Sequence, residues 1–112
     1  EKHTVSLQLD YYMSAQFAGI ATALGHNLYE QKDIDVEFLP ICPVGQEMHR
    51  VRHNANASSS SDVHLGSIEQ NIFIPTLAQD PHLKVKAVAA MFGKSPLCLA
   101  SLSNKSSNYQ ES

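Results

Sequence analysis

The sequence predicts an α/β domain with three layers, in which helices cover both faces of a mainly parallel sheet. Two kinds of segment alternate along the chain. In one kind apolar and polar residues alternate, as in strands, and in the other apolar residues recur every three or four positions, as in helices. This order favours crossover connections between parallel strands. Near the end of the chain, two apolar runs over 85–92 and 97–102 are typical of strands buried on both faces.

The first half of the chain predicts a strand, a helix and a second strand. Apolar and polar residues alternate over 4–10, which indicates a strand that ends at a polar turn. From Ser14, a plausible N-cap, apolar residues recur at three- and four-residue steps and predict a helix to Tyr29. Residues 35–39 form a short apolar segment that stops at Pro40, as a strand does.

The second half continues the alternation. Pro75 is expected to bend the last helix or to end its regular part. The elements expected here are a helix over 44–53, a polar serine-rich loop over 54–61, a short strand over 63–66, a helix over 68–77 and buried strands over 85–92 and 97–102.

The bulk composition fits one globular domain. The 112 residues are 43 % hydrophobic and 17 % charged, with a formal net charge of -3. The basic residues are scattered, so we expect no nucleic-acid partner, and no apolar run approaches the roughly 20 residues of a membrane span. We expect an ordered region over 1–102 and a disordered tail over 103–112, which is rich in Ser and Asn. Because the chain begins with Glu1, we expect a processed protein or a piece of a longer one.

The cysteines and histidines do not predict a metal site. Cys42 and Cys98 lack metal-ligand spacing and are expected to be small buried apolar residues. His49 and His53 are four apart and would share a helix face, which can hold a metal. Arginines interleave with them and no carboxylate follows at the next helical step, so a solvated face is favoured. His64 is expected in the core or on an edge strand.

Several short segments occur in an order that resembles a known family. They are Leu9-Asp10-Tyr11, Gly19, Asp33-Ile34-Asp35-Val36-Glu37, Ser61-Asp62-Val63-His64-Leu65-Gly66-Ser67 and Lys94-Ser95-Pro96-Leu97. On these segments the chain is similar, from Val5 to Leu102, to the amino-terminal lobe of the thiamine-pyrimidine synthase and sulfonate-binding-protein-like family, which has the type II periplasmic binding protein fold.

This resemblance implies a two-lobed, clamshell-like protein that holds its ligand between the lobes. The chain would supply the first lobe, and the second lobe would lie in a longer parent chain. The implied ligand is a small molecule such as a thiamine pyrimidine precursor, another aromatic heterocycle or a sulfonate-like solute. The implied role is in thiamine precursor biosynthesis or uptake, with a periplasmic location for a transporter-type protein and a cytoplasmic one for a synthase-type protein.

The candidate ligand-binding residues follow the ends of the predicted strands. In parallel sheets these ends meet at one edge, where loops and helix N-termini bind ligands. Tyr11 could stack on a flat heterocycle, and Asp10 or Glu69 could accept hydrogen bonds from ring amino groups. Each residue alone also fits a structural role as a turn, packing or helix-terminal residue. As a cluster, the residues predicted to bind the ligand are Asp10, Tyr11, Tyr12, Gly66, Ser67, Glu69 and Ser95.

Synthase chemistry is not expected from this chain. The pyrimidine-making enzymes of the family use a histidine from a helix and a cysteine-rich iron-binding segment. No histidine lies between Ser67 and Ala78, no cysteine-rich run is present, and Phe17 stands where many relatives carry a histidine. We therefore assign no catalytic residue, metal or cofactor. Two alternatives to a binding lobe stay open: a fragment of a thiamine pyrimidine synthase, and a lone lobe that binds nothing and serves as an interaction module.

Overall fold

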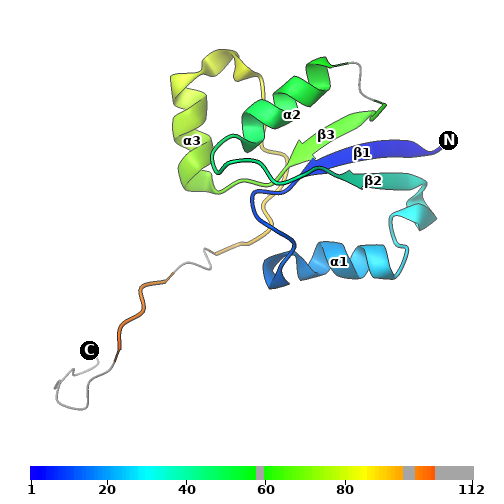
Figure 1. Ribbon diagram of the computed structural model, residues 1–112, viewed down its shortest axis with the longest axis horizontal. Helices are drawn as coiled ribbons and strands as arrows, with labels where there is room; N and C mark the ends of the chain where they lie inside the picture. Colours follow the sequence, from blue (N-terminus) through cyan, green and yellow to red (C-terminus); the bar gives the residue numbers. More distant parts are fainter. Residues whose placement is uncertain (58–59, 95–97, 103–112) are drawn as a thin grey trace.

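The structure, a computed structural model, describes residues 1–57, 60–94 and 98–102. Its elements in chain order are β1 (His3–Gln8), η1 (Ala15–Phe17), α1 (Ala18–Gly25), η2 (Glu30–Lys32), β2 (Ile34–Phe38), α2 (Glu47–Asn56), β3 (Val63–Gly66), α3 (Gln70–Gln79) and η3 (Pro81–Leu83), where η marks a short 3-10 helix. Figure 1 shows α1 on one side of the sheet and α2 and α3 on the other. The predicted α/β class is confirmed, and the predicted tail over 103–112 lies outside the described residues.

The sheet has three strands in the order β2-β1-β3, and both pairs are parallel. Strand β1 lies in the centre, so its backbone is hydrogen-bonded on both sides. Val5 is level with Val36 of β2 and Val63 of β3. Since level residues of parallel strands point to the same face, these three side chains share one face of the sheet.

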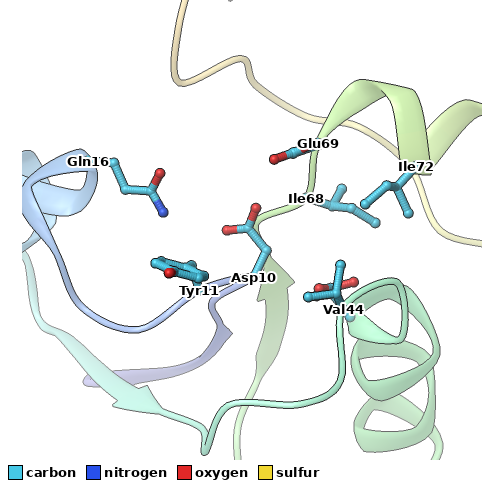
Figure 2. A pocket seen from close by; sticks show the side chains of 8 residues that line it. Asp10, Tyr11, Gln16, Val44, Ile68, Glu69 and Ile72 are labelled. Atoms are coloured by element: carbon cyan, nitrogen blue, oxygen red, sulfur yellow. The ribbon is translucent and has the colours of Figure 1, made fainter. Parts of the chain in front are cut away.

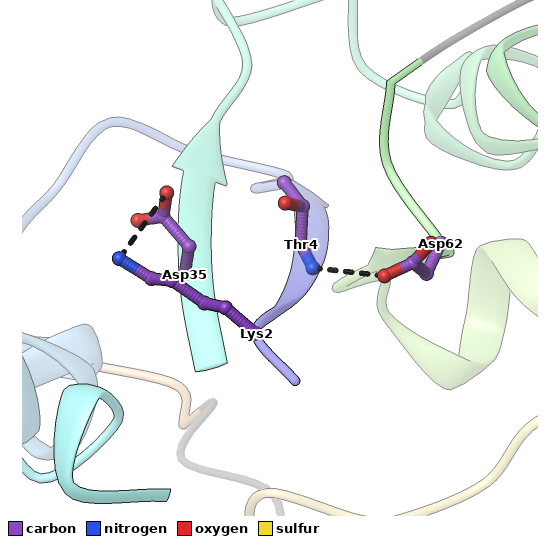
Figure 3. Close-up of polar contacts among 4 residues, drawn as sticks. All are labelled: Lys2, Thr4, Asp35 and Asp62. Carbon is purple, nitrogen blue, oxygen red and sulfur yellow. Dashed lines mark hydrogen bonds and ion pairs between the residues drawn. The ribbon is translucent and has the colours of Figure 1, made fainter. Parts of the chain in front are cut away.

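The amino-terminal end of β1 is tied to both neighbouring strands (Figure 3). The Thr4 N–H donates to Oδ2 of Asp62 at 3.1 Å, and the Asp62 N–H donates back to the Thr4 carbonyl at 2.8 Å. On the β2 side, Lys2 Nζ lies 3.9 Å from Oδ2 of Asp35. Exposed ion pairs of this kind contribute little, so the reciprocal pair between Thr4 and Asp62 is the contact that fixes the start of β3.

The face of β1 toward α2 is polar and nevertheless buried. Ser6 and Gln8 are each only 2 % exposed. The Ser6 hydroxyl lies 2.7 Å from Nδ1 of His64, which is the half-buried strand residue expected from the sequence. Gln8 Nε2 donates to the carbonyl of Pro40 at 2.9 Å. These partners replace the water that the polar groups lose on burial, and without them burial would be unfavourable.

The opposite face of the sheet is apolar and is covered unevenly. Helix α1 lies beside β2, where Leu24 and Val36 line a shared groove. On β3, Val63 and Leu65 point to the same face and keep 44 % and 38 % of their surface exposed. The small set of buried apolar residues therefore lies mostly around the ends of the elements: Leu9, Phe17, Cys42, Met48 and Leu83.

Helix α2 packs very closely on the end of β3. A Cβ added to Gly66 would lie 2.8 Å from Cγ2 of Val51 and 3.4 Å from the carbonyl oxygen of Gln8. Any other residue begins with that carbon, so it would force the Val51 side chain or the helix to shift. The missing Cβ of Gly66 therefore sets how near α2 lies to the sheet.

The first predicted helix is shorter than expected. Over the range from Ser14 to Tyr29 the chain forms η1 and then α1, which ends at Gly25, and the Ser14 side chain makes no capping hydrogen bond. Asn27 adopts a left-handed conformation with φ of 55°, which takes the chain out of the helix. Apolar spacing marks a helix face, but it does not show where the backbone turns away.

The two later helices form with shifted ends. Helix α2 begins three residues after the predicted start at Val44, since Gly45, with φ of 89°, turns the chain just before it. Pro75 lies inside α3 and does not end it. It removes one backbone donor, and close by the Thr76 hydroxyl donates to the Ile72 carbonyl at 2.7 Å.

The two buried strands predicted at the end of the chain are wrong for the residues that the structure describes. Residues 85–92 and 98–102 are not in any strand, and residue 97 lies outside the described ranges. Val88 is 80 % exposed and Leu99 is fully exposed. An apolar run indicates a tendency toward burial, but burial needs a surface against which the run can pack, and here no other described element covers it.

Replacing Gly66 by Ala tests the close approach of α2. We expect the free energy of unfolding to fall by about 1–3 kcal/mol, as for other overpacked sites. Adding Val51→Ala should recover part of this loss, because it removes the methyl group that the new Cβ would meet. Urea unfolding of the four proteins in this double-mutant cycle measures the coupling, and strictly additive effects would contradict the packing described.

Replacing Phe17 by Ala tests whether this buried ring holds η1 against the rest of the fold. Its side chain is 3 % exposed, so Phe17→Ala should lower the free energy of unfolding by about 3 kcal/mol or more. Leu28→Ala, at a half-exposed position in the same crossover, is the control and should cost clearly less. If both variants lose the same free energy of unfolding, measured by heat or urea, Phe17 does not anchor η1.

Candidate functional site

A cavity of about 300 Å³ lies at the edge of the sheet where β1 and β3 end (Figure 2). Three segments contribute to it: the loop after β1 with η1, the loop before α2 with the first turn of α2, and the loop before α3 with the first turn of α3. The cavity is partly open to solvent. Its lining residues are Asp10, Tyr11, Gln16, Val44, Glu47, Ile68, Glu69 and Ile72.

Asp10 and Ser67 join the ends of β1 and β3. The Ser67 hydroxyl donates to Oδ1 of Asp10 at 2.5 Å, and the Asp10 N–H donates to the Ser67 hydroxyl oxygen at 3.0 Å. The Ser67 N–H also donates to the Gln8 carbonyl at 2.9 Å. One carboxylate oxygen of Asp10 is thus held by the fold, while its side chain still lines the cavity.

The structure brings part of the predicted cluster together. Asp10, Tyr11 and Glu69 line the cavity, and Ser67 supports Asp10 from behind. Glu69 is the N-cap residue of α3 and its side chain makes no capping hydrogen bond, so its carboxylate is not used by the helix. Tyr12 does not line the cavity.

One of the predicted residues has another position, and one is not described. Gly66 lies under α2, where it allows close packing, and it is not among the lining residues. Ser95, which the sequence analysis placed in the cluster, lies outside the described residues.

Tyr11 presents an aromatic ring at the mouth of the cavity. The ring is 48 % exposed, and it lies with its centroid 4.2 Å from that of Tyr12 at an angle of 39°. The pKa of Tyr11 is raised above its usual value. The largest cause is a hydrogen bond with the Tyr12 side chain, and the next is Coulomb repulsion from the same residue. The Tyr11 hydroxyl therefore stays neutral near neutral pH, and its half-exposed ring can stack on a flat molecule.

Sequence reasoning missed five lining residues. Glu47 is the most unusual of them, because it is 1 % exposed and neither carboxylate oxygen has a hydrogen-bond partner among the described residues. Its place in the first turn of α2 is a pattern typical of helix starts, and that signal says nothing about burial. The other missed residues are Gln16, Val44, Ile68 and Ile72.

Cys42 lies close to this carboxylate and is shielded from water. Burial raises the pKa of the Cys42 thiol, and the nearby charge of Glu47 raises it further. The charge of Arg50 acts in the opposite direction. The expectation that both cysteines are buried is confirmed for Cys42 and wrong for Cys98, which is exposed. Cys98 belongs to the apolar run that no other described element covers.

No metal centre is evident in the part of the chain that the structure describes. Over 1–57, 60–94 and 98–102, no group of three or more His, Cys, Asp or Glu residues could hold a metal ion. His49 and His53 are both exposed on α2. Within the same ranges no helix has the length and apolar character needed to cross a membrane.

Comparisons with known proteins do not identify a relative. No protein-family model matches the chain, and no curated protein or solved structure is significantly similar to it.

The two cysteines should differ in reactivity. We expect iodoacetamide to modify Cys98 quickly and Cys42 slowly, because a raised pKa lowers the thiolate fraction and burial limits access. The substitution Glu47→Gln should modestly increase the Cys42 rate at fixed pH, since it removes one cause of the raised pKa. Mass spectrometry of the time course measures both rates, and equal rates in the folded protein would contradict the burial of Cys42.

Proposed function

We propose that this chain is one lobe of a protein that binds a small organic molecule at the carboxyl edge of its parallel sheet. The observation that carries the proposal is the cavity of about 300 Å³, which is lined by residues from three separate segments of the chain. Ligand sites in parallel α/β folds occupy this edge, where loops and helix N-termini converge. In this proposal the lobe has the type II periplasmic binding protein arrangement.

The size and shape of the cavity support a site shared with a second surface. Small-molecule pockets have volumes of about 300–1,000 Å³ and enclose most of the ligand. The cavity here is at the lower end of that range and is partly open to solvent. A second lobe in a longer parent chain would cover the open part and complete the enclosure, as in a clamshell.

The uncovered apolar surface of β3 also supports a further covering element. Val63 and Leu65 are substantially exposed on an edge strand, whose outer backbone has no partner strand in the described sheet. Exposed apolar edges of this kind are unfavourable for a soluble domain and mark surfaces that other elements or partners cover. An interaction module that binds no small molecule is the alternative that this surface favours.

The ligand classes considered are thiamine pyrimidine precursors, with a role in their synthesis or uptake, and sulfonate-like solutes. A thermal-shift and NMR titration of the full chain with hydroxymethylpyrimidine and with methanesulfonate tests the proposal. A ligand that binds only the folded protein raises its melting temperature. Shifts of amide signals around Asp10, Glu47 and Glu69 are expected, and a chain that responds to neither compound would favour the interaction module.

Tyr11 tests whether an aromatic ring contributes to the site. For an aromatic ligand, Tyr11→Ala should reduce affinity about two- to tenfold, the loss expected for one stacked ring pair. The stability of the free protein should change little, because the ring is half exposed. Tyr12→Ala is the matched control, as it removes an equally exposed ring that does not line the cavity. A large loss of stability with unchanged affinity would make Tyr11 a packing residue.

A further inference from the structure

The buried carboxylate of Glu47 has no hydrogen-bond donor among the described residues. It is the first residue of α2, it is 1 % exposed, and it lines the cavity. Neither Oε1 nor Oε2 accepts a hydrogen bond from a residue that the structure describes, and the ion pairs of these residues do not include Glu47. Since a carboxylate removed from water is unfavourable unless donors or a counter-charge replace the water, this group lacks a partner. Each oxygen exposes less than 1 Å², so a ligand in the cavity reaches the carboxylate when the side chains that cover it shift.

The charges around the cavity have one sign. Asp10, Glu47 and Glu69 contribute carboxylates, and no Lys or Arg is among the described lining residues. The N-termini of α2 and α3 begin beside the cavity, and each has the effect of about half a positive charge. Together the two helices offset only about one of the three negative charges. Summed over the lining residues and the two helix N-termini, the charge is negative, which favours a cation over a sulfonate or another anion.

The geometry distinguishes an organic cation from a metal ion. The three carboxylates do not form a group that could hold a metal. One oxygen of Asp10 already accepts the Ser67 hydroxyl. The remaining lining is largely apolar or aromatic, with Val44, Ile68, Ile72 and the ring of Tyr11 around the carboxylates (Figure 2). This combination matches a small flat molecule that has a charged N–H group on one side.

We propose that Glu47 binds the cationic N–H group of the ligand, and that the ligand class is a small flat organic cation such as an amidinium or a protonated amino-heterocycle. The proposal rests on the proposed binding function of the same cavity and narrows its ligand. Glu47 accepts the charged hydrogen bonds, Tyr11 and the apolar residues contact the flat face, and Asp10 and Glu69 add negative charge at the rim.

The test uses three flat probes of similar size with different charge: benzamidine as the cation, benzamide as the neutral analogue and benzenesulfonate as the anion. NMR titration of the full chain gives the affinity and the position of each probe. We expect benzamidine to bind at the cavity, benzamide to bind at least about tenfold more weakly and benzenesulfonate not to bind, because charged hydrogen bonds contribute more than neutral ones.

Variants of Glu47 separate recognition from folding. Glu47→Gln should lower the benzamidine affinity about ten- to hundredfold and leave benzamide binding nearly unchanged. Glu30→Gln, at an exposed glutamate outside this cavity, is the matched control and should change neither. Glu47→Met should abolish benzamidine binding and raise the urea midpoint, since it removes a buried charge that the fold does not satisfy.

The outcomes distinguish this inference from the function on which it rests. Benzenesulfonate binding at the cavity in preference to benzamidine would overturn the cation class and keep the binding site. Unchanged benzamidine affinity in Glu47→Gln, or a marked fall in stability in Glu47→Met, would overturn the role of Glu47. If none of the three probes shifts the amide signals of the cavity up to millimolar concentration, both the inference and the proposed binding function fail.

Discussion

The central position of β1 is the constraint on which the rest of the structure depends. It is the only described strand that is paired on both sides, so its register sets the positions of β2 and β3 together. The reciprocal hydrogen bonds of Thr4 and Asp62 fix one end of this arrangement, and the contacts between Asp10 and Ser67 fix the other. Because both strands are parallel to β1, their following loops leave from one edge, and the cavity forms there.

The closeness of α2 to the sheet links this strand arrangement to the site. Gly66 leaves no Cβ between β3 and Val51. The polar face of β1 beneath α2 is satisfied by a hydrogen bond between Ser6 and His64 and by one from Gln8 to the Pro40 carbonyl. With the helix held near the strand ends, its first turn carries Glu47 into the cavity wall. A wider helix–sheet spacing would leave this carboxylate nearer to water.

The cavity is a place where stability and binding have opposite requirements. Folding favours buried groups with partners, and Glu47 has none among the described residues. The same absence of partners makes it a strong acceptor for a ligand that brings N–H donors. The raised pKa of Cys42 reflects the same buried surroundings, since the thiolate would form in a site with little water and next to the Glu47 carboxylate. The apolar surface of Val63 and Leu65 on β3 has a similar conflict. It is unfavourable when exposed to water and would be stabilised by another element or partner that covers it.

The sequence alone determined the class of the fold and the first part of the site. Period-two and helical spacings located all three strands and the three α-helices, because these patterns follow from local backbone geometry. Parallel topology then brought Asp10, Tyr11 and Glu69 to one edge. Only the tertiary structure decided that Glu47 is buried without a partner, that Gly66 serves packing, and that the runs over 85–92 and 98–102 are exposed. The hydrophobicity of a segment predicts that it tends to be buried. Whether it is buried depends on which other surface packs against it, and this is set by the tertiary structure.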